Sequence, residues 1–184
     1  MSVSGWIDQQ SQLDALTTAV ANAATIGLDT EFVRVSTFHP KPGLIQMAVD
    51  RDAFLIDPLA DLDLKAFGHA LTGTTTSILH AAQEDYEVLF RLTGSIPSPV
   101  FDTQVAYALL NDKISLSLSG LVAELLGKEL SKEQTRSDWT RRPLSEAQYR
   151  YAKEDVLVLR PIYKILCRQL EQAGRLDWMR EEMR

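Results

Sequence analysis

The sequence has a single cysteine and no long apolar run. Cys167 is the one cysteine among 184 residues, so no disulfide within the chain is possible and a reducing compartment suits it. No run of 18 apolar residues exists, which excludes a transmembrane helix. The first residues lack the basic and apolar regions of a signal peptide. We therefore expect a soluble, cytoplasmic protein that does not act at a membrane.

Internal repeats, low-complexity tracts and an excess of basic charge are also missing. Apolar residues make up 45% and charged residues 24%, as in globular proteins, and the length suits one domain. Lys and Arg number 19 against 25 Asp and Glu, which gives a net charge of −6. A protein that held nucleic acid by bulk charge alone would be basic. A nucleic-acid substrate would therefore need local compensation, which divalent cations bound to carboxylates supply.

The hydrophobic pattern predicts an α/β domain with a mixed sheet. Apolar runs predict strands over residues 25–33, 44–49, 53–56, 77–81 and 100–101. The first three strands are expected to form an antiparallel meander, with a Pro- and Gly-containing turn at 39–43. Helical spacing and glycine stops predict helices over about 8–23, 62–71, 84–92, 103–110 and 118–126. Residues 128–143 are expected to form an exposed loop. Ser145 and Gln148 form a capping box, so a helix is expected from about residue 146, with Pro161 ending or kinking it.

Several carboxylates interrupt these apolar segments. Asp29 and Glu31 lie two apart on a strand, so they share one face, and burying both without a partner would cost free energy. Solvated acids on an edge strand are an equally good explanation. Asp85 lies in the first turn of a helix, where the helix dipole alone would favour it. Tyr151 and Asp155 lie four apart on a helical face, where an arginine or a backbone N–H could satisfy the acid.

Taken together, these four acids and the tyrosine suggest a metal site. Mg²⁺ prefers carboxylate oxygens, and two such ions about 4 Å apart can activate water and stabilise a leaving oxygen in phosphodiester cleavage. One shared site is simpler than three independent accidents. Periodicity alone does not bring the three elements together.

The same residues resemble three motifs of a known family. The sequence is similar to the ribonuclease D branch of the DEDD (DnaQ-like) 3′–5′ exonucleases, in the tyrosine-containing subgroup. The first motif is Leu-Asp-Thr-Glu-Phe at 28–32, and the second is Leu-His-Ala-Ala-Gln-Glu-Asp at 79–85. The third is Tyr-Ala-Lys-Glu-Asp at 151–155, preceded by Trp-Thr-Arg-Arg-Pro-Leu at 139–144. The three motifs in this order make the resemblance specific over about residues 20–170.

The resemblance implies an RNase H-like fold, with a five-stranded mixed sheet flanked by helices. It also implies two divalent cations, Mg²⁺ or Mn²⁺, one held by Asp29, Glu31 and Asp155 and the other by Asp29 and Asp85. Tyr151 would position the attacking water; a phenol with a pKa near 10 is a poor base at neutral pH. The whole of 1–184 is then expected to be one exonuclease domain. Longer members carry C-terminal HRDC domains that help bind RNA, and none is expected here.

Further residues are candidates for contact with the substrate. Residues 128–153 carry a local charge of +3 and include Trp139, so this segment could follow phosphates and stack a base. A tryptophan folded back on the core is an equally good explanation. Arg141 and Arg142 are the preferred phosphate contacts. The backbone of Thr30 and the side chains of Phe32 and Leu44 could contact the terminal nucleotide, although Phe32 and Leu44 are residue types more often found in the core. His80 could join them, although a core role suits it better.

The sequence thus predicts a metal-dependent 3′–5′ exoribonuclease that releases 5′-nucleotides from single-stranded RNA ends by a two-metal-ion mechanism. The partner is then single-stranded RNA, with DNA possible because this fold also trims DNA, and no protein partner can be inferred. A non-catalytic RNA-binding module is the alternative of another class. Such a module would be expected to have lost a motif acid, and none of the four is lost.

Overall fold

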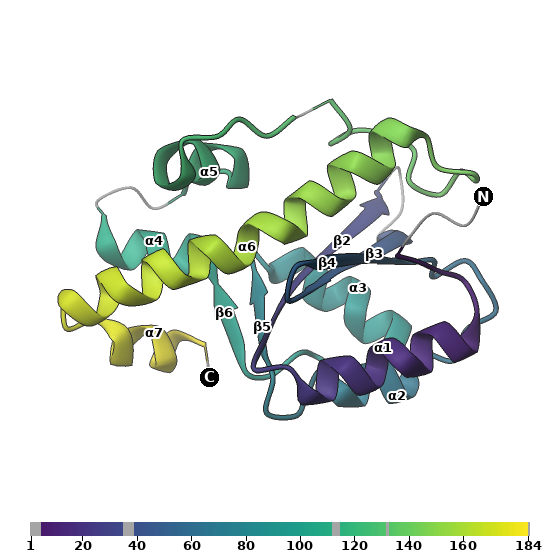
Figure 1. Ribbon diagram of the computed structural model, residues 1–184, viewed down its shortest axis with the longest axis horizontal. Coiled ribbons are helices and arrows are strands. Elements are labelled where there is room, and N and C mark those ends of the chain that lie inside the picture. Colours follow the sequence, from purple (N-terminus) through teal and green to yellow (C-terminus); the bar gives the residue numbers. More distant parts are fainter. Residues whose placement is uncertain (1–4, 35–38, 112–114, 132, 184) are drawn as a thin grey trace.

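The computed structural model describes residues 5–34, 39–111, 115–131 and 133–183 (Figure 1). The strands are β1 Trp6–Ile7, β2 Thr25–Val33, β3 Lys41–Val49, β4 Asp52–Ile56, β5 Thr76–Leu79 and β6 Val100–Asp102. The helices are α1 Gln10–Asn22, α2 Lys65–Ala70, α3 Gln83–Thr93, α4 Thr103–Leu110, α5 Leu118–Leu126, α6 Glu146–Gln172 and α7 Leu176–Glu182.

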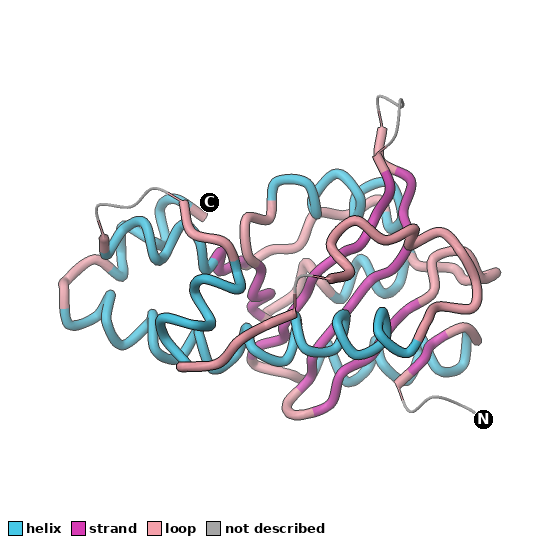
Figure 2. The backbone as a smooth tube through the Cα atoms, turned by 90° about the horizontal axis from the view of Figure 1, so that it is seen from above, coloured by secondary structure: helices cyan, strands magenta, loops and turns pink. Residues whose placement is uncertain are grey.

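These elements form one mixed sheet between two layers of helices. The strand order is β1-β4-β3-β2-β5-β6, with β2, β3 and β4 antiparallel and β5 and β6 continuing in parallel from β2. Apolar side chains of α1, α2 and α3 pack in one core cluster, and those of α4, α5, α6 and α7 pack in another. Figure 1 shows α6 running along one side of the sheet and α1 along the opposite side, and Figure 2 shows the strands from above. The α/β class, the mixed sheet and the antiparallel meander are therefore confirmed.

Within the described ranges, the sheet has six strands rather than the expected five. The additional strand, β1, has two residues, forms the edge of the sheet and pairs in parallel with β4. The Leu55 N–H donates to the Gly5 carbonyl at 2.7 Å and the Asp57 N–H to the Ile7 carbonyl at 2.9 Å. A two-residue strand is too short to show an alternating pattern, so β1 could not be predicted from periodicity.

The expected turn at 39–43 is wrong, because β3 begins at Lys41 and includes Pro42 and Gly43. Pro42 lies opposite Phe32, where the pairing register shifts, and a proline is tolerated in a strand at such a bulge because the ladder is already interrupted. Gly43 is required by a close approach, since a Cβ there would lie 2.6 Å from the Cβ of Trp139.

The expected helix boundaries hold at most positions and fail at two. Gly94 and Gly127 end α3 and α5 in the left-handed conformation, with φ of 76° and 61°. The helix expected over 62–71 is shorter, as α2 covers six residues. Pro161 does not end α6, which runs for 27 residues. The buried residues Leu159, Ile162 and Leu166 flank the proline, and their burial offsets its missing hydrogen bond.

None of the helices in the described ranges is long and apolar enough to cross a membrane.

Candidate metal-binding active site

The central strand β2 supplies two carboxylates on one face. β2 lies between β3 and β5, and its residues Ile26, Gly27 and Leu28 are buried, so Asp29 and Glu31 emerge from the middle of the sheet. The alternative of an edge strand is excluded by this position. Both acids are partly buried, and like charges on one strand face repel each other.

The long helix α6 brings the third carboxylate to the same place. Ser145 and Gln148 form the predicted capping box, which fixes the start of α6 and so the faces of Tyr151 and Asp155. The helix backbone also approaches β2 closely, since a Cβ on Gly27 would lie 2.6 Å from the carbonyl oxygen of Val156. As a result, carboxylate oxygens of Asp29, Glu31 and Asp155 all lie within 4.8 Å of one another.

The first turn of α3 places Asp85 beside this group. Asp85 is 6% exposed, and its Oδ1 accepts a hydrogen bond from Thr30 Oγ1 at 2.5 Å. Asp85 lies outside the group of three oxygens, but its charge acts on both Asp29 and Glu31. Thr30 therefore contributes a side-chain hydrogen bond that fixes an acid, which the sequence did not reveal. Its neighbour Glu84 is exposed and lies 3.5 Å from Arg34, so it takes no part.

Burial raises the pKa of every one of these acids, and repulsion from the other site acids adds to the rise at Asp29 and Glu31. Burial, followed by the charges of Asp155 and Asp85, raises the pKa of Glu31 to about 9. Burial, followed by the charge of Asp85, raises the pKa of Asp29 well above its ordinary value. Burial also raises the pKa of Asp85 and of Asp155 to about 7, with hydrogen bonds from Thr30 and Tyr151 opposing the rise. Carboxylates held together at this cost are typical of a functional site.

The tyrosine of α6 lies against the same group and remains protonated. Burial and the charge of Asp155 raise the pKa of Tyr151 above its ordinary value of 10. Its hydroxyl lies 3.4 Å from Thr135 Oγ1, and its ring centroid is 5.9 Å from that of Trp139. Tyr151 can therefore donate a hydrogen bond at neutral pH but cannot accept a proton as a base.

Next to the acids lies a small cavity that sequence reasoning missed. It has a volume of about 250 Å³ and is lined by Tyr151 and Asp155 together with Ser117, Ser119 and Leu130. Ser117 caps α5 by accepting a hydrogen bond from the Gly120 N–H at 3.3 Å. A serine before a helix is explained by capping alone, so the sequence does not indicate that Ser117 also lines this cavity.

Two residues predicted to contact the substrate are part of the core instead. Trp139 is 1% exposed and packs in a cluster with Leu44 and Leu144, so the stacking role is wrong and the alternative of a tryptophan folded onto the core is confirmed. The loop at 128–143 is therefore not exposed throughout. Leu44 is fully buried, which leaves it no surface for a terminal base.

Arg142 also has a structural role in place of the predicted phosphate contact. Its guanidinium donates to both carboxylate oxygens of Asp57, at 2.9 and 2.6 Å, and to the carbonyl oxygens of Gly43 and Trp139. This bidentate ion pair fastens the loop to the end of β4 and leaves little of the guanidinium for a phosphate. Arg141 beside it is exposed and stays a candidate contact.

The remaining candidates lie at the edge of the site. His80 follows β5, and its Nδ1 lies 2.9 Å from Thr103 Oγ1, which itself donates to the Leu79 carbonyl at 3.0 Å. These contacts favour a structural role for His80. Phe32 is half-buried at the bulge of β2 and remains a candidate. Asp102 caps α4 by accepting hydrogen bonds from the Gln104 and Val105 N–H groups, and it is not among the three clustered carboxylates.

The fold and the site together define an RNase H-like nuclease domain. A family model described as 3′-5′ exonuclease matches residues 5–171. The chain therefore belongs to the 3′–5′ exonuclease family.

Relatives and solved structures agree with this assignment. Ribonuclease D of Pseudomonas paraeruginosa is 46% identical over 158 residues, which are 85% of this chain and 42% of that protein. The crystal structure of Escherichia coli RNase D, an exoribonuclease involved in structured RNA processing, superposes with a TM-score of 0.91 at 37% identity, covering 96% of this chain and 48% of that one. Brucella melitensis NrnC superposes with a TM-score of 0.76 at 28% identity, covering 89% and 81%. The chain spans about half the length of the curated relatives it matches.

Proposed function

We propose that this protein is a metal-dependent 3′–5′ exoribonuclease that releases 5′-nucleotides from single-stranded RNA ends. The observation that carries the proposal is the meeting of Asp29, Glu31 and Asp155 within 4.8 Å, with Asp85 beside them. The ribonuclease D relatives support RNA as the substrate class.

The donor set fits two divalent cations. Four carboxylates from three elements offer the hard oxygen ligands that Mg²⁺ and Mn²⁺ prefer, and their raised pKa values support the proposal, because bound positive charge would stabilise the ionised forms. Asp29, Glu31 and Asp155 would hold one ion, and Asp29 and Asp85 the other. Bound ions of this kind supply water activation and charge stabilisation in phosphodiester hydrolysis.

The protein side chains around the carboxylates bind and orient the reacting groups. Tyr151 keeps its proton and donates a hydrogen bond that orients the attacking water. Thr30 fixes the rotamer of Asp85 through its 2.5 Å hydrogen bond. Arg141 is placed on the exposed loop before α6, where its charge attracts the phosphate next to the scissile bond.

An RNA degradation assay tests the proposal. With Mg²⁺ or Mn²⁺, the protein should shorten 5′-labelled single-stranded RNA one nucleotide at a time, and EDTA should abolish the reaction. A matched DNA strand tests the alternative of a DNA exonuclease, because the 2′-OH is what distinguishes the two substrates. Internal cleavage fragments, or DNA cut faster than RNA, would contradict the proposal.

The variants Asp85→Asn and Glu84→Gln provide a matched pair for this assay. They change neighbouring acids in the first turn of α3, of which Asp85 is buried at the site and Glu84 is exposed. Asp85→Asn should lose most of the activity and Glu84→Gln should retain it. Full activity of Asp85→Asn would contradict a role for Asp85 in holding the cations, and equal loss in both variants would show that the effect is not specific to the buried acid.

A further inference from the structure

A second cavity shares no lining residue with the candidate active site. The cavity has a volume of about 780 Å³ and lies between the start of β3, the second half of α3 and the loop after β4. We call it the basic pocket, because three of its seven lining residues, His39, Lys41 and Arg91, carry basic groups and none of the seven is acidic. In a chain with a net charge of −6, a cavity lined by basic and no acidic residues favours an anionic ligand.

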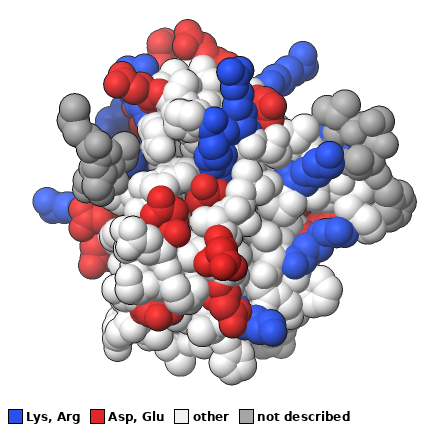
Figure 3. Space-filling view, turned by 90° about the vertical axis from the view of Figure 1, so that its right-hand side faces the viewer, with Lys and Arg blue, Asp and Glu red and all other residues white. Residues whose placement is uncertain are grey.

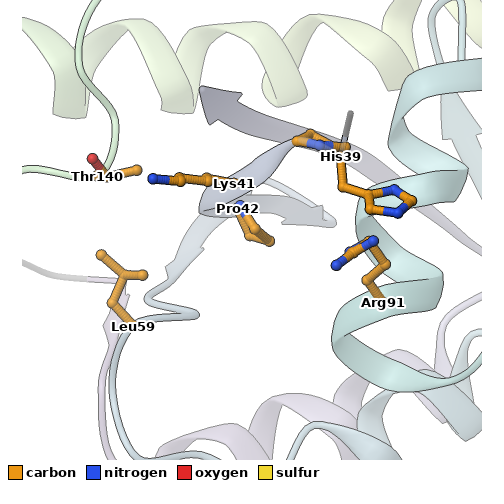
Figure 4. A pocket seen from close by; sticks show the side chains of 7 residues that line it. His39, Lys41, Pro42, Leu59, Arg91 and Thr140 are labelled. Atoms are coloured by element: carbon orange, nitrogen blue, oxygen red, sulfur yellow. The ribbon is translucent and has the colours of Figure 1, made fainter. Parts of the chain in front are cut away.

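The two strongest cations of the basic pocket have no ion-pair partner among the residues that the structure describes. Lys41 and Arg91 are exposed, and neither forms a side-chain hydrogen bond or an ion pair with any residue that the structure describes. Figure 4 shows Lys41 reaching toward Thr140 along one side, while Arg91 projects from α3 on the other. Cations that flank one cavity without a counter-charge favour an anionic ligand.

The basic pocket also offers apolar surface. Pro42 and Leu59 line it, and Leu59 is 50% exposed despite its large apolar side chain. Apolar and cationic groups in one groove are the combination that holds the bases and phosphates of a single strand. A simple inorganic anion would use only the charges.

The basic pocket lies within reach of a strand whose 3′ end occupies the active site. Asp85 and Arg91 are six residues apart on α3, or roughly 9 Å along the helix axis. That rise matches about three stacked nucleotides at roughly 3.4 Å each. The neighbouring acids Glu84 and Glu87 are paired with Arg34 at 3.5 and 3.0 Å, and His39 adds a second partner to Glu87 at 2.9 Å. Figure 3 shows basic side chains flanking the acidic ones on one face of the molecule.

We propose that the basic pocket binds backbone phosphates of the substrate RNA a few nucleotides upstream of the 3′ end. This inference rests on the proposed function and assigns a second contact to the same substrate. It gives an acidic protein a local means of holding a polyanion away from its carboxylates. A short substrate does not reach the pocket, so the contact should increase the affinity for long strands alone.

The test compares a 12-nucleotide RNA with a dinucleotide in Mg²⁺. The double variant Lys41→Gln/Arg91→Gln should raise KM for the 12-mer about tenfold, because two phosphate contacts are lost, and should leave dinucleotide hydrolysis unchanged. The slope of log affinity against log salt should fall by about 1.4, from about 0.7 for each phosphate on a single strand. An unchanged KM for the 12-mer, or an equal loss with the dinucleotide, would overturn the proposal.

A matched control removes the same charge from another cavity. Arg51 and Lys164 are exposed, line a cavity of about 360 Å³ beside α6, and form no ion pair with any residue in the described ranges. The double variant Arg51→Gln/Lys164→Gln should bind the 12-mer like the wild type. An equal loss in this control would show that bulk charge, and not the basic pocket, accounts for the effect.

Binding without catalysis separates this inference from the proposed function. Fluorescence anisotropy with the labelled 12-mer in EDTA should show weaker binding for Lys41→Gln/Arg91→Gln than for wild type, even if the wild type hydrolyses no RNA. A pocket that serves free nucleotides would bind 5′-AMP in a variant-sensitive manner while 12-mer binding stayed unchanged. A pocket that binds an acidic protein would bind an oligoglutamate peptide in a variant-sensitive manner while 12-mer binding stayed unchanged. Either of these two outcomes would overturn the proposal.

Discussion

At the scale of single residues, the buried carboxylate of Asp155 destabilises the metal-free protein when it is ionised, and it is expected to be a ligand once cations bind. It is 7% exposed, lies within 4.8 Å of Asp29 and Glu31, and has a pKa raised to about 7 by burial. Asp155→Asn keeps the shape and removes the charge. We expect kcat on RNA to fall about a thousandfold, because an anionic ligand is lost. In EDTA, the same variant should unfold at a higher temperature than wild type, because a buried repulsion is removed.

Both effects of Asp155→Asn are needed for this account. Activity assays and thermal unfolding of the metal-free protein measure them separately. A variant that loses activity and also unfolds earlier in EDTA would indicate that Asp155 supports the fold rather than the cations.

Tyr151 is expected to act as a donor and not as a base. Tyr151→Phe retains the ring that contacts Trp139 and loses the hydroxyl. We expect kcat to fall about 10- to 100-fold, less than for Asp155→Asn, because orientation of the water is lost while its activation remains. The shape of the pH–rate profile should stay the same in Tyr151→Phe. Loss of an ascending limb, along which the wild-type rate rises with pH, would show that the phenol takes a proton.

Residue types singled out the acids but were a poor guide to two of the aromatic and basic candidates. Two carboxylates on an apolar strand made Asp29 and Glu31 candidates from local sequence, because burying both without a partner would cost free energy. The fates of Trp139 and Arg142 depend on partners far along the chain, since Trp139 packs against Gly43 and Arg142 binds Asp57. No local pattern reports such a partner.

At the scale of secondary-structure elements, the packing of α6 against β2 sets the position of the site. Gly27→Ala would place a Cβ 2.6 Å from the backbone oxygen of Val156, which cannot move without the helix. We expect a loss of about 1–3 kcal/mol in the free energy of unfolding and a larger fall in kcat, because Asp155 moves away from β2. Denaturant unfolding and the RNA assay measure the two effects.

Gly73→Ala is the matched control for the Gly27 substitution. A Cβ at Gly73 meets only the Ala70 carbonyl, at an ordinary contact distance of 3.4 Å, so stability and activity should both be close to wild type. Equal behaviour of the two alanine variants would contradict the view that helix–strand contact at Gly27 positions the acids.

Element boundaries followed from the sequence where a single residue determines the backbone. The glycines that end α3 and α5 and the capping box of α6 act locally, and each lies where it was predicted. The early start of β3 and the continuation of α6 past Pro161 depend on tertiary packing, which offsets the local preference for a turn or a break.

At the scale of the whole molecule, the raised carboxyl pKa values couple stability to pH. In the metal-free protein, the folded-state pKa values of Glu31, Asp85 and Asp155 are about 9, 7 and 7, above the ordinary values of 4.5 and 3.8. Between roughly pH 4 and pH 9 the folded state therefore holds more protons than the unfolded state, and stability falls as pH rises.

Thermal unfolding in EDTA should show this fall from pH 6 to pH 9. Mg²⁺ at pH 8 should restore the lost stability, because cations bind the ionised carboxylates of the folded state. The Asp155→Asn variant should show a shallower fall between pH 6 and pH 8. A melting temperature that rises with pH in EDTA would contradict the raised pKa values of these carboxyl groups in the folded state.

The convergence of the acids is a property of the whole fold and was not available from periodicity. Residues 29, 85 and 155 are separated by more than fifty positions each, and only the order β3-β2-β5 with α6 above it brings them together. The family resemblance implied the ligand set, and the structure places the three elements side by side.

Diffraction from crystals soaked in Mn²⁺, recorded at the manganese absorption edge, tests the central claim most directly. The account predicts two anomalous peaks, one among the oxygens of Asp29, Glu31 and Asp155 and one between Asp29 and Asp85. Ordered carboxylates with no peak between them, at a Mn²⁺ concentration that supports RNA hydrolysis, would contradict it.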